Sequence, residues 1–495
     1  MIGVDLGGAL NLVGAIIKYL ALAFVLPAAL ALGYGEPVWP WALSASITAG
    51  AGWSLERFTR GKERIGPREG FFVVAFTWVA TAFFISLPYL FADEPQLASP
   101  IDAYFEAISG VTTTGSSILT DIEALSRSVA MWRQFSQWLG GMGIIVLALA
   151  ILPRLRVGGR QLLQSELPGP DVERLTMTIR DTARRLWLLY VTLTALEILS
   201  LALLGWTGAD PAMSLYEAVA HAFTTMPTGG FSTRARSIET FAAVTQWVVV
   251  VFIVLAGANF ALMYRTIRRH GHPARDDEFR LYLAVIVLGS LALFGKLVAD
   301  GVYAGEEAVR AAVFQTVTIV TTTGYASADF SNWPVLAVVL LFVLMFIGGS
   351  AGSTSGSIKV VRHLILAHLL RRELDQTVHR EAVVPIRFNR AVVDERTIRG
   401  VAAFILLYLV VFTLGALGLA LEGARSGVEL SFVEAFSAAA TTIGNIGPGF
   451  GFLGPMGSFE PFSAPSKAIM IVLMWMGRLE LIPVVVLFTR SYWRA

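Results

Sequence analysis

Ten apolar runs, each long enough to cross a membrane as a helix, dominate this sequence. They lie at 12–33, 38–55, 71–92, 134–153, 186–207, 244–264, 281–299, 334–357, 400–421 and 466–489. A helix needs about 20 mostly apolar residues to cross the hydrocarbon core of a bilayer. Only 15% of the residues are charged, against about 25% in soluble domains. The sequence therefore predicts an all-α polytopic membrane protein.

The same composition argues against several other classes of protein. The net charge of +2 gives no basic field that would attract nucleic acid. The chain contains no Cys, which excludes disulfides, iron–sulfur clusters and thiolate catalysis. It also has no His-Glu-x-x-His motif, and five of its six His lie in or beside the connections. We therefore do not expect an enzyme.

Basic residues are distributed unevenly between the connections. Most of the 38 Lys and Arg lie in the connections 56–70, 154–185, 265–280 and 359–399 and in the tail 490–495. Cytoplasmic connections of membrane proteins carry such an excess. Ten spans then put both termini in the cytoplasm, with the first run retained as a spanning helix rather than removed as a signal peptide.

The opposite connections contain a four-fold internal repeat. Each has a short, moderately apolar segment followed by a stretch rich in Thr and Gly, at 104–117, 216–233, 314–325 and 432–449. A long apolar run precedes each segment and another follows it. The unit of span, short segment, Gly-rich stretch and span thus occurs four times, and the runs within 12–55 stand outside it. A repeat of this kind outweighs any single motif in assigning a fold.

The short segments have the length of re-entrant helices, because about ten residues cannot cross a bilayer. Glu106, Glu217 and Glu434 lie near their starts, where a carboxylate interacts favourably with the positive end of a helix dipole. The partially negative C-terminal ends would then point toward a shared cavity that favours a cation. The Gly-rich stretches cannot face lipid, since their backbone groups would lack hydrogen-bond partners.

Glycine permits backbone angles that turn carbonyl groups toward one axis, and rings of carbonyl oxygens replace the hydration shell of a cation in selectivity filters. The predicted filter residues are Thr113, Thr114, Gly115, Thr228, Gly229, Gly230, Thr322, Thr323, Gly324, Asn445, Ile446 and Gly447. In the second stretch, either Gly229 or Gly230 corresponds to the glycine of the other three. Four ordinary loops with Gly by chance are the alternative, and they would not share position, context and spacing.

These motifs resemble the Trk/Ktr/HKT superfamily of potassium transporters over essentially the whole chain. The matching sequences are Val-Thr-Thr-Thr-Gly-Ser-Ser at 111–117, Gln-Trp-Leu-Gly-Gly-Met-Gly at 137–143, Gly-Gly-Phe-Ser-Thr at 229–233 and Asn-Ile-Gly-Pro-Gly at 445–449. The resemblance implies four M1–pore helix–M2 repeats around a central pore. The additional N-terminal helix pair is similar to the Trk branch. The implied division is 1–65 for that pair and 66–158, 159–270, 271–372 and 373–495 for the repeats.

The function that this resemblance implies is uptake of K⁺ across the bacterial inner membrane, with K⁺ as the transported ion and no cofactor bound by this chain. Superfamily members with Ser at the first filter glycine tend to pass Na⁺, so Gly115 implies selectivity for K⁺. A sodium- or proton-coupled cation symporter of the same superfamily, or a Ktr-type subunit, is the alternative. A conventional alternating-access symporter usually has inverted repeats, whereas these four repeats share one orientation.

The eighth run is interrupted by a segment rich in Gly and Ser, from Gly348 to Lys359, which is a poor continuous helix. It lacks the Gly-Lys-Ser/Thr of a phosphate-binding Walker loop, and close helix packing of small residues is a further alternative. The resemblance implies a flexible intramembrane loop at 348–358 that obstructs the pore beneath the filter. The predicted gate residues are Gly348, Gly349, Gly352, Ser353, Thr354, Gly356, Lys359 and Arg478.

Arg478 lies midway along the tenth run. An intramembrane charge costs at least about 2.5–3.5 kcal/mol, which makes a functional role the default interpretation. The resemblance implies that this side chain faces the pore, contacts the loop and forms a barrier to cations. An ion pair with Glu480, or extension of the side chain toward the cytoplasm, is the alternative. His221, on the second short segment, is interpreted as a packed, hydrogen-bonded histidine.

The resemblance also implies partners: a homodimer, bound to a cytosolic ring of nucleotide-binding RCK/KTN regulatory subunits. The connection 359–399 is long and basic, and it offers either a docking surface or an orientation signal alone. Regulatory nucleotide would then bind the partner, because this chain has no site for it.

Overall fold

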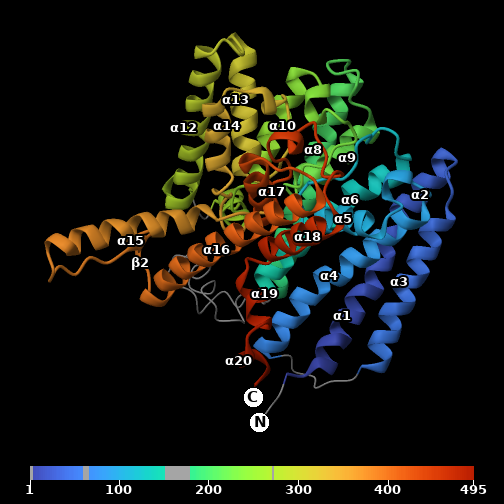
Figure 1. Ribbon diagram of the computed structural model, residues 1–495, viewed down its shortest axis with the longest axis horizontal. Coiled ribbons are helices and arrows are strands. Elements are labelled where there is room, and N and C mark those ends of the chain that lie inside the picture. Colours follow the sequence, from blue (N-terminus) through green and yellow to red (C-terminus); the bar gives the residue numbers. More distant parts are fainter. Residues whose placement is uncertain (1–3, 60–65, 151–178, 270–271, 495) are drawn as a thin grey trace.

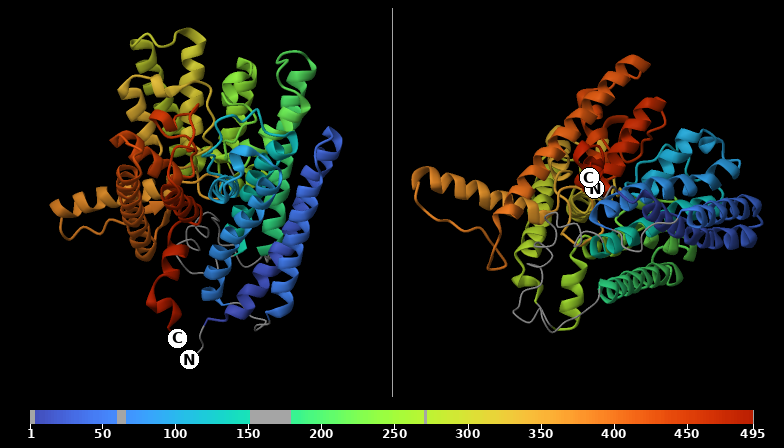
Figure 2. Two further views of the ribbon diagram at one scale, coloured as in Figure 1. Left: turned by 45° about the vertical axis from the view of Figure 1, so that its right-hand side comes forward. Right: turned by 90° about the horizontal axis from the view of Figure 1, so that it is seen from below.

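The computed structural model describes residues 4–59, 66–150, 179–269 and 272–494, and helices make up nearly all of its regular structure (Figure 1). Much of the basic connection 154–185 lies outside the described residues. The two ends of the chain lie close together at one end of the molecule (Figures 1 and 2).

An N-terminal pair of long helical segments precedes the repeats. One consists of α1 (Leu6–Leu20), the 3₁₀ helix η1 (Ala21–Phe24) and α2 (Val25–Tyr34), and the other is α3 (Trp39–Phe58). The two segments pack closely at Gly14, where a Cβ atom would lie only 2.7 Å from the backbone nitrogen of Glu56. Small residues allow such close approach in membranes. Lys18 and Glu56 form an ion pair across the same contact.

Four groups of helices follow, and the second helix of each group is too short to cross a membrane. Figure 2 shows these groups from two further directions. The first contains α4 (Pro67–Phe91), α5 (Pro100–Val111) and α6 (Arg127–Ala150). The second contains α8 (Ile179–Trp206), α9 (Leu215–Thr225), α10 (Ala243–Ala256) and α11 (Phe260–Ile267). The third contains α12 (Asp277–Ala299), α13 (Gly305–Val320) and α14 (Val335–Leu344). The fourth contains α16 (Glu395–Ser426), α17 (Phe432–Gly444), α18 (Ala464–Arg478), α19 (Ile482–Leu487) and α20 (Arg490–Trp493).

The predicted all-α polytopic architecture with four helical repeats is therefore confirmed. The connections contain further 3₁₀ helices, namely η2 (Pro95–Leu97), η3 (Ser237–Thr240), η4 (Pro273–Arg275), η5 (Phe330–Asn332) and η6 (Gly451–Leu453). Most buried hydrophobic residues form one core that surrounds the short helices.

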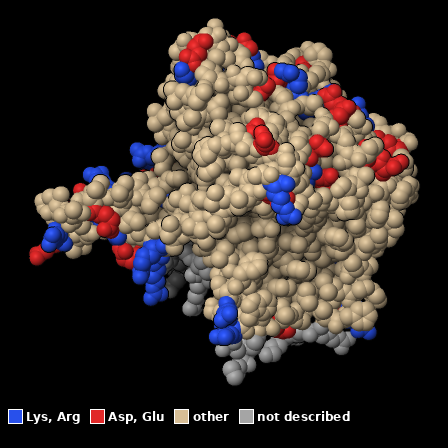
Figure 3. Space-filling model, viewed as in Figure 1, with Lys and Arg blue, Asp and Glu red and all other residues tan. Residues whose placement is uncertain are grey.

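Within the described residues, five segments are long and apolar enough to cross a membrane. They are Leu6–Tyr34, Arg68–Phe91, Thr182–Trp206, Asp277–Ala299 and Glu395–Ser426. The pair α10 and α11 makes a sixth if it is taken as one span, although its two helices are bent by 98°. Figure 3 shows a broad surface of uncharged residues over the body of the molecule, with charged side chains mainly toward its edges. Such a surface suits contact with lipid.

The four short helices α5, α9, α13 and α17 have 12, 11, 16 and 13 residues, which is too short to span. Two of them begin with the expected carboxylates, because Glu217 and Glu434 lie in the first turn. The expectation for Glu106 is wrong. Helix α5 begins at Pro100, so Asp102 is the acid of its first turn and Glu106 lies in the buried half of the helix.

Two of the predicted continuous spans are broken. The run 244–264 ends as a helix at Ala256 and resumes at Phe260, where the side chain of Asn259 caps α11 by accepting a hydrogen bond from the Leu262 nitrogen. The run 466–489 breaks after Arg478, because Glu480 and Leu481 have positive φ angles of 59° and 58°. Such angles cannot continue a right-handed helix. Arg478 is thus the last residue of α18 rather than the middle of a span.

The eighth run is interrupted as the sequence predicts. Helix α14 ends at Leu344, and the chain stays irregular until α15 (Val360–Val378). An arm then projects from the body (Figure 1), built from α15 and the short antiparallel strands β1 (Arg387–Phe388) and β2 (Ala391–Val392). The connection 359–399 forms most of this arm.

Candidate functional site

The backbone after each short helix follows one pattern. Two residues separated by one other residue have positive φ in all four repeats, and the second of them is always glycine. The pairs are Thr113 and Gly115, Thr228 and Gly230, Thr322 and Gly324, and Asn445 and Gly447. Glycine adopts positive φ without the strain that a Cβ atom brings. Gly230 therefore has the conformation of the other three glycines, and Gly229 stands in register with Thr114, Thr323 and Ile446.

These four glycines form a closed ring of contacts between the repeats. A side chain on Gly115 would overlap the carbonyl oxygen of Gly229, one on Gly230 that of Thr323, and one on Gly324 that of Ile446. The ring closes because a Cβ atom on Gly447 would lie 3.0 Å from the carbonyl oxygen of Thr114. Each glycine thus lies against the carbonyl that precedes the glycine of the next repeat. We call residues 113–115, 228–230, 322–324 and 445–447 the filter segments.

Side chains hold the filter segments from behind. The Gln137 amide on α6 donates to the Gly229 oxygen over 2.7 Å and accepts from the Phe231 nitrogen over 3.1 Å. The Asn445 amide donates to Thr114 Oγ1 and to the Met474 oxygen, both over 2.9 Å. The second and fourth segments are therefore bound to α6 and α18, and the first segment is bound to the fourth.

A buried ion pair supports the first segment. Glu106 on α5 and Arg133 on α6 lie 2.7 Å apart, and both side chains are completely buried. The same carboxylate accepts a hydrogen bond from Ser117 Oγ over 2.9 Å. Arg133 also donates to the carbonyl oxygen of Ser232 and lies over the ring of Phe231. One ion pair therefore connects the first two repeats.

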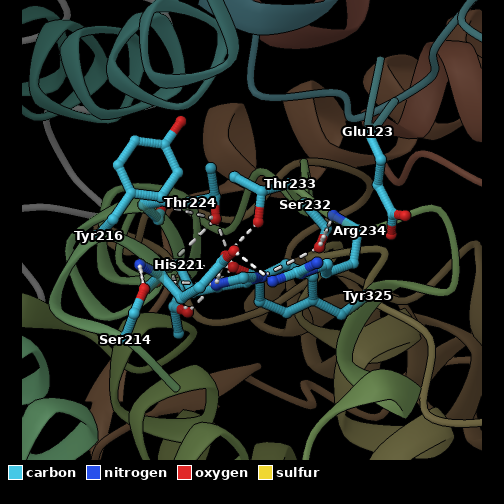
Figure 4. A network of polar contacts seen from close by, with 12 residues as sticks. Glu123, Ser214, Tyr216, His221, Thr224, Ser232, Thr233, Arg234 and Tyr325 are labelled. Atoms are coloured by element: carbon cyan, nitrogen blue, oxygen red, sulfur yellow. Dashed lines mark hydrogen bonds and ion pairs between the residues drawn. The ribbon is translucent and has the colours of Figure 1, made fainter. Parts of the chain in front are cut away.

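The second repeat has its own polar network (Figure 4). His221 is fully buried, with Nδ1 2.9 Å from the Glu217 carbonyl oxygen and Nε2 2.9 Å from Ser232 Oγ. This confirms the interpretation of His221 as a packed, hydrogen-bonded residue. The Glu217 carboxylate pairs with Arg234 over 3.0 Å. Tyr325, from the third repeat, donates to the His221 carbonyl oxygen over 3.0 Å.

An outer hollow of about 70 Å³ opens directly onto the ring. It is lined by the four ring glycines together with residues that include Ser116, Arg133, Ser232, Arg234, Pro448 and Phe459. The ring glycines therefore face this hollow on one side.

The loop 348–358 lies on the other side of the filter segments. The Gly356 nitrogen donates to Thr322 Oγ1 over 2.6 Å, and Thr354 Oγ1 donates to the Met226 oxygen over 3.0 Å. A Cβ atom on Gly356 would overlap the Gly444 oxygen and lie 3.0 Å from Asn445 Cβ. The loop thus contacts the second, third and fourth repeats directly at the filter.

Further hydrogen bonds fix the shape of the loop. The Gly348 nitrogen donates to the Ile358 oxygen over 2.8 Å, and the Ser353 hydroxyl donates to the Ser350 oxygen over 2.6 Å. Gly352 has a φ of 72°. A side chain on Gly349 would overlap the side chain of Ser355. The Lys359 ammonium donates to the Ser355 oxygen. All the predicted gate residues of the third repeat therefore belong to one compact structure.

Arg478 reaches the same loop. Its Nη1 donates to the Thr354 carbonyl oxygen over 2.7 Å, its Nη2 donates to the Gly140 oxygen over 3.5 Å, and the residue is 2% exposed. The alternative partner Glu480 pairs instead with Arg362, whose guanidinium lies 3.7 Å from the centre of the Phe404 ring. Arg478 is therefore held by backbone carbonyls.

Sequence reasoning missed the supporting residues of the site. On sequence alone, Arg133 has no assigned role and Gln137 has only a place in a matching motif. A polar residue at the start of an apolar run was the available signal for both. Their partners Glu106 and Gly229 lie 27 and 92 positions away in the chain, so no local pattern could have identified the contacts.

Known proteins resemble this chain over almost its full length. Residues 42–494 match the TrkH family, described as cation transport protein. The Trk system potassium uptake protein TrkH of Vibrio parahaemolyticus is 36% identical over 497 residues, which cover 98% of this chain and 99% of that protein. The Trk system potassium uptake protein TrkG of Escherichia coli is 34% identical over 437 residues, or 87% of each chain.

A solved structure is similar throughout. The crystal structure of the potassium transporter TrkH from Vibrio parahaemolyticus matches with a TM-score of 0.88 at 34% identity, and the match covers 99% of this chain and 100% of that one. Family, relatives and fold agree on transport rather than catalysis. This chain therefore belongs to the TrkH family of cation transport proteins.

Proposed function

We propose that this chain is the membrane subunit of a Trk-type system that takes up K⁺ through the four filter segments. The relatives at 34–36% identity are named potassium uptake proteins. The closed ring of glycine–carbonyl contacts carries the proposal. Four segments in one register offer matched rings of carbonyl oxygens, which can replace the hydration shell of a cation.

The short helices support cation binding electrostatically. All four filter segments follow directly from the C-terminal ends of α5, α9, α13 and α17. Those ends carry a partial negative charge from the aligned peptide dipoles. Four such ends around one axis favour a cation and oppose an anion, as the half-helix ends of transporters do.

The gate in this proposal consists of the loop 348–358 and Arg478. The loop contacts Met226, Thr322 and Gly444 beside the filter segments, so an ion that leaves the filter meets it first. Arg478 adds a positive charge at the same level. Displacement of the loop and removal of this charge would each open the path.

The assembly proposed here follows the Trk pattern. The chain forms a homodimer in the bacterial inner membrane with both termini cytoplasmic, and a cytosolic nucleotide-binding RCK/KTN subunit regulates it. This chain binds K⁺ as cargo and no cofactor. Its units are the helix pair 1–65 and the repeats 66–158, 159–270, 271–372 and 373–495.

The proposal is tested by cation flux into liposomes that contain the purified chain, with K⁺ and Na⁺ gradients compared. We expect flux selective for K⁺ and a reduced K⁺/Na⁺ permeability ratio in Gly115→Ser, because a side chain there would displace the Gly229 carbonyl. Gly208→Ser is the matched control, since Gly208 has a φ of 74° but no atom lies within 4 Å of the place that its Cβ would take. Equal ratios in the wild type and Gly115→Ser would contradict the filter assignment.

A further inference from the structure

The residue after each ring glycine contacts the repeat that precedes its own around the ring. These residues are buried, and they are Ser116, Phe231, Tyr325 and Pro448. The Ser116 hydroxyl donates to the Gly447 oxygen of the fourth repeat over 2.8 Å. The Arg133 guanidinium of the first repeat lies 4.1 Å from the centre of the Phe231 ring. A Cβ atom on Gly324 of the third repeat would lie 3.0 Å from Pro448 Cδ. We call the four residues the outer ring.

Within the outer ring, Tyr325 connects the third filter segment to the short helix of the second repeat. Its side chain is completely buried, and its hydroxyl donates to the His221 carbonyl oxygen over 3.0 Å (Figure 4). The same hydroxyl lies 3.2 Å from Thr225 Oγ1 and within hydrogen-bond distance of Thr224 Oγ1. All three partners belong to the C-terminal end of α9. One phenol therefore binds the third repeat to this helix end.

The C-terminal end of α9 also holds the second filter segment. The Gly229 nitrogen donates to the Thr224 carbonyl oxygen over 2.8 Å, and the Thr228 nitrogen donates to the Thr225 carbonyl oxygen over 2.9 Å. Tyr325 thus attaches the third segment to the same turn that fixes the backbone of the second segment.

The third filter segment has a different support from the others. The side-chain amide of Gln137 donates to Gly229 in the second segment, and that of Asn445 connects the fourth segment to the first. The third segment instead accepts a hydrogen bond from the loop, where the Gly356 nitrogen donates to Thr322 Oγ1 over 2.6 Å. In the proposed function this loop moves when the path opens. The contact of Tyr325 with α9 does not involve the loop, so it persists when the loop moves.

We propose that Tyr325 is a positioning residue that sets the distance between the second and third filter segments and thereby the selectivity for K⁺ over Na⁺. A ring of carbonyl oxygens discriminates between cations through the number and placement of those oxygens. The inference rests on the proposed role of residues 228–230 and 322–324 in the filter. It adds a selectivity-determining side chain that lies outside the filter segments.

The variant Tyr325→Phe separates positioning from general stability, because it removes only the hydroxyl and keeps the ring. The hydroxyls of Thr224 and Thr225 still donate to the His221 carbonyl oxygen, over 3.0 and 2.8 Å, so this buried oxygen stays paired. The backbone nitrogen of the next residue still donates to Ser237 Oγ over 3.2 Å. We therefore expect a folded variant.

Tyr492→Phe is the matched control. Tyr492 is 4% exposed, and its hydroxyl donates to the Arg68 carbonyl oxygen over 2.8 Å in α20, near the end of the chain. Both variants thus remove one hydroxyl from a buried tyrosine that binds a backbone carbonyl. Their unfolding temperatures should be equal.

Flux into liposomes tests the selectivity. The K⁺/Na⁺ permeability ratio should fall at least fivefold in Tyr325→Phe and stay at the wild-type value in Tyr492→Phe. A wild-type ratio in Tyr325→Phe would overturn the inference. A reduced ratio together with an unfolding temperature below that of Tyr492→Phe would overturn it too, because the tyrosine would then act through general stability.

Unfolding temperatures in KCl and NaCl give a second measurement that needs no flux. An ion that binds only the folded filter raises the unfolding temperature. The K⁺ concentration that produces half of this rise should be at least fivefold higher in Tyr325→Phe than in the wild type, and equal concentrations would overturn the inference. Selectivity that is lost in Gly115→Ser but kept in Tyr325→Phe refutes the inference alone. A wild type that shows neither K⁺ selectivity nor stabilisation by K⁺ refutes the proposed function, and the inference with it.

Discussion

The guanidinium of Arg478, at the end of α18, donates a 2.7 Å hydrogen bond to the carbonyl oxygen of Thr354 in the loop 348–358. The two residues belong to the fourth and third repeats. The hydroxyl of Thr354 in turn donates to the Met226 carbonyl oxygen, two residues before the second filter segment. A short series of contacts thus connects a buried positive charge, the loop and the filter.

Replacement of Arg478 by Ala should increase K⁺ flux several-fold. The change removes both the positive charge on the proposed ion path and the hydrogen bond that holds the loop at Thr354. Flux into liposomes measures the effect, with Arg425→Ala as the control, because the Arg425 side chain is 82% exposed. Reduced flux in a variant that purifies as folded protein would instead indicate a purely structural role for Arg478.

Gly356→Ala should move the loop away from the filter segments. Its Cβ atom would overlap the Gly444 carbonyl oxygen, and the loop would lose the bond from the Gly356 nitrogen to Thr322 Oγ1. Overpacking of this kind costs about 1–3 kcal/mol, so we expect a lower unfolding temperature together with higher basal flux. Gly295→Ala is the control, since no atom lies within 4 Å of its added Cβ. A lower unfolding temperature with unchanged flux would show that the loop does not control the flux.

Removal of one partner of the ion pair between Glu106 and Arg133 should be strongly destabilising. Both side chains are completely buried, and breaking a buried pair costs about 3–5 kcal/mol because a buried charge remains unpaired. Thermal unfolding of the purified protein should show a large decrease for Arg133→Met. The double variant Glu106→Leu with Arg133→Met should lose less stability than the single variant. An equal or greater loss in the double variant would show that the packing of these side chains, not their charge, is what matters.

Gln137→Leu should lower the K⁺/Na⁺ permeability ratio while the protein stays folded. The substitution leaves the Gly229 oxygen and the Phe231 nitrogen without their partner, and each unpaired buried group costs about 1–3 kcal/mol. The second filter segment then loses its fixed position. Gln96→Leu, in an exposed outer connection, should leave the ratio unchanged. An unaltered ratio in Gln137→Leu would mean that the ring contacts alone hold the segment.

The sequence by itself determined the membrane class and the four-fold architecture, because both follow from patterns along the chain. Apolar runs of spanning length fit a membrane, because exposing them to water is unfavourable. The recurrence of Thr and Gly after short segments predicts a backbone with unusual φ angles. The interruption between Leu344 and Val360 was predictable for the same reason, since Gly348, Gly349, Gly352 and Gly356 are poor helix formers. Local composition carries this information.

Other features depended on contacts between distant residues. The register of Gly230 was decided by its contact with Thr323 of the next repeat. The breaks at Asn259 and Glu480 interrupt runs that remain apolar, so hydrophobicity could not reveal them. The contact of Arg478 with Thr354, and the pairing of Glu480 with Arg362, decided between two partners for Arg478 that the sequence left open. Only the tertiary structure brings these groups together, because a buried polar group takes whichever partner the packing of the repeats supplies.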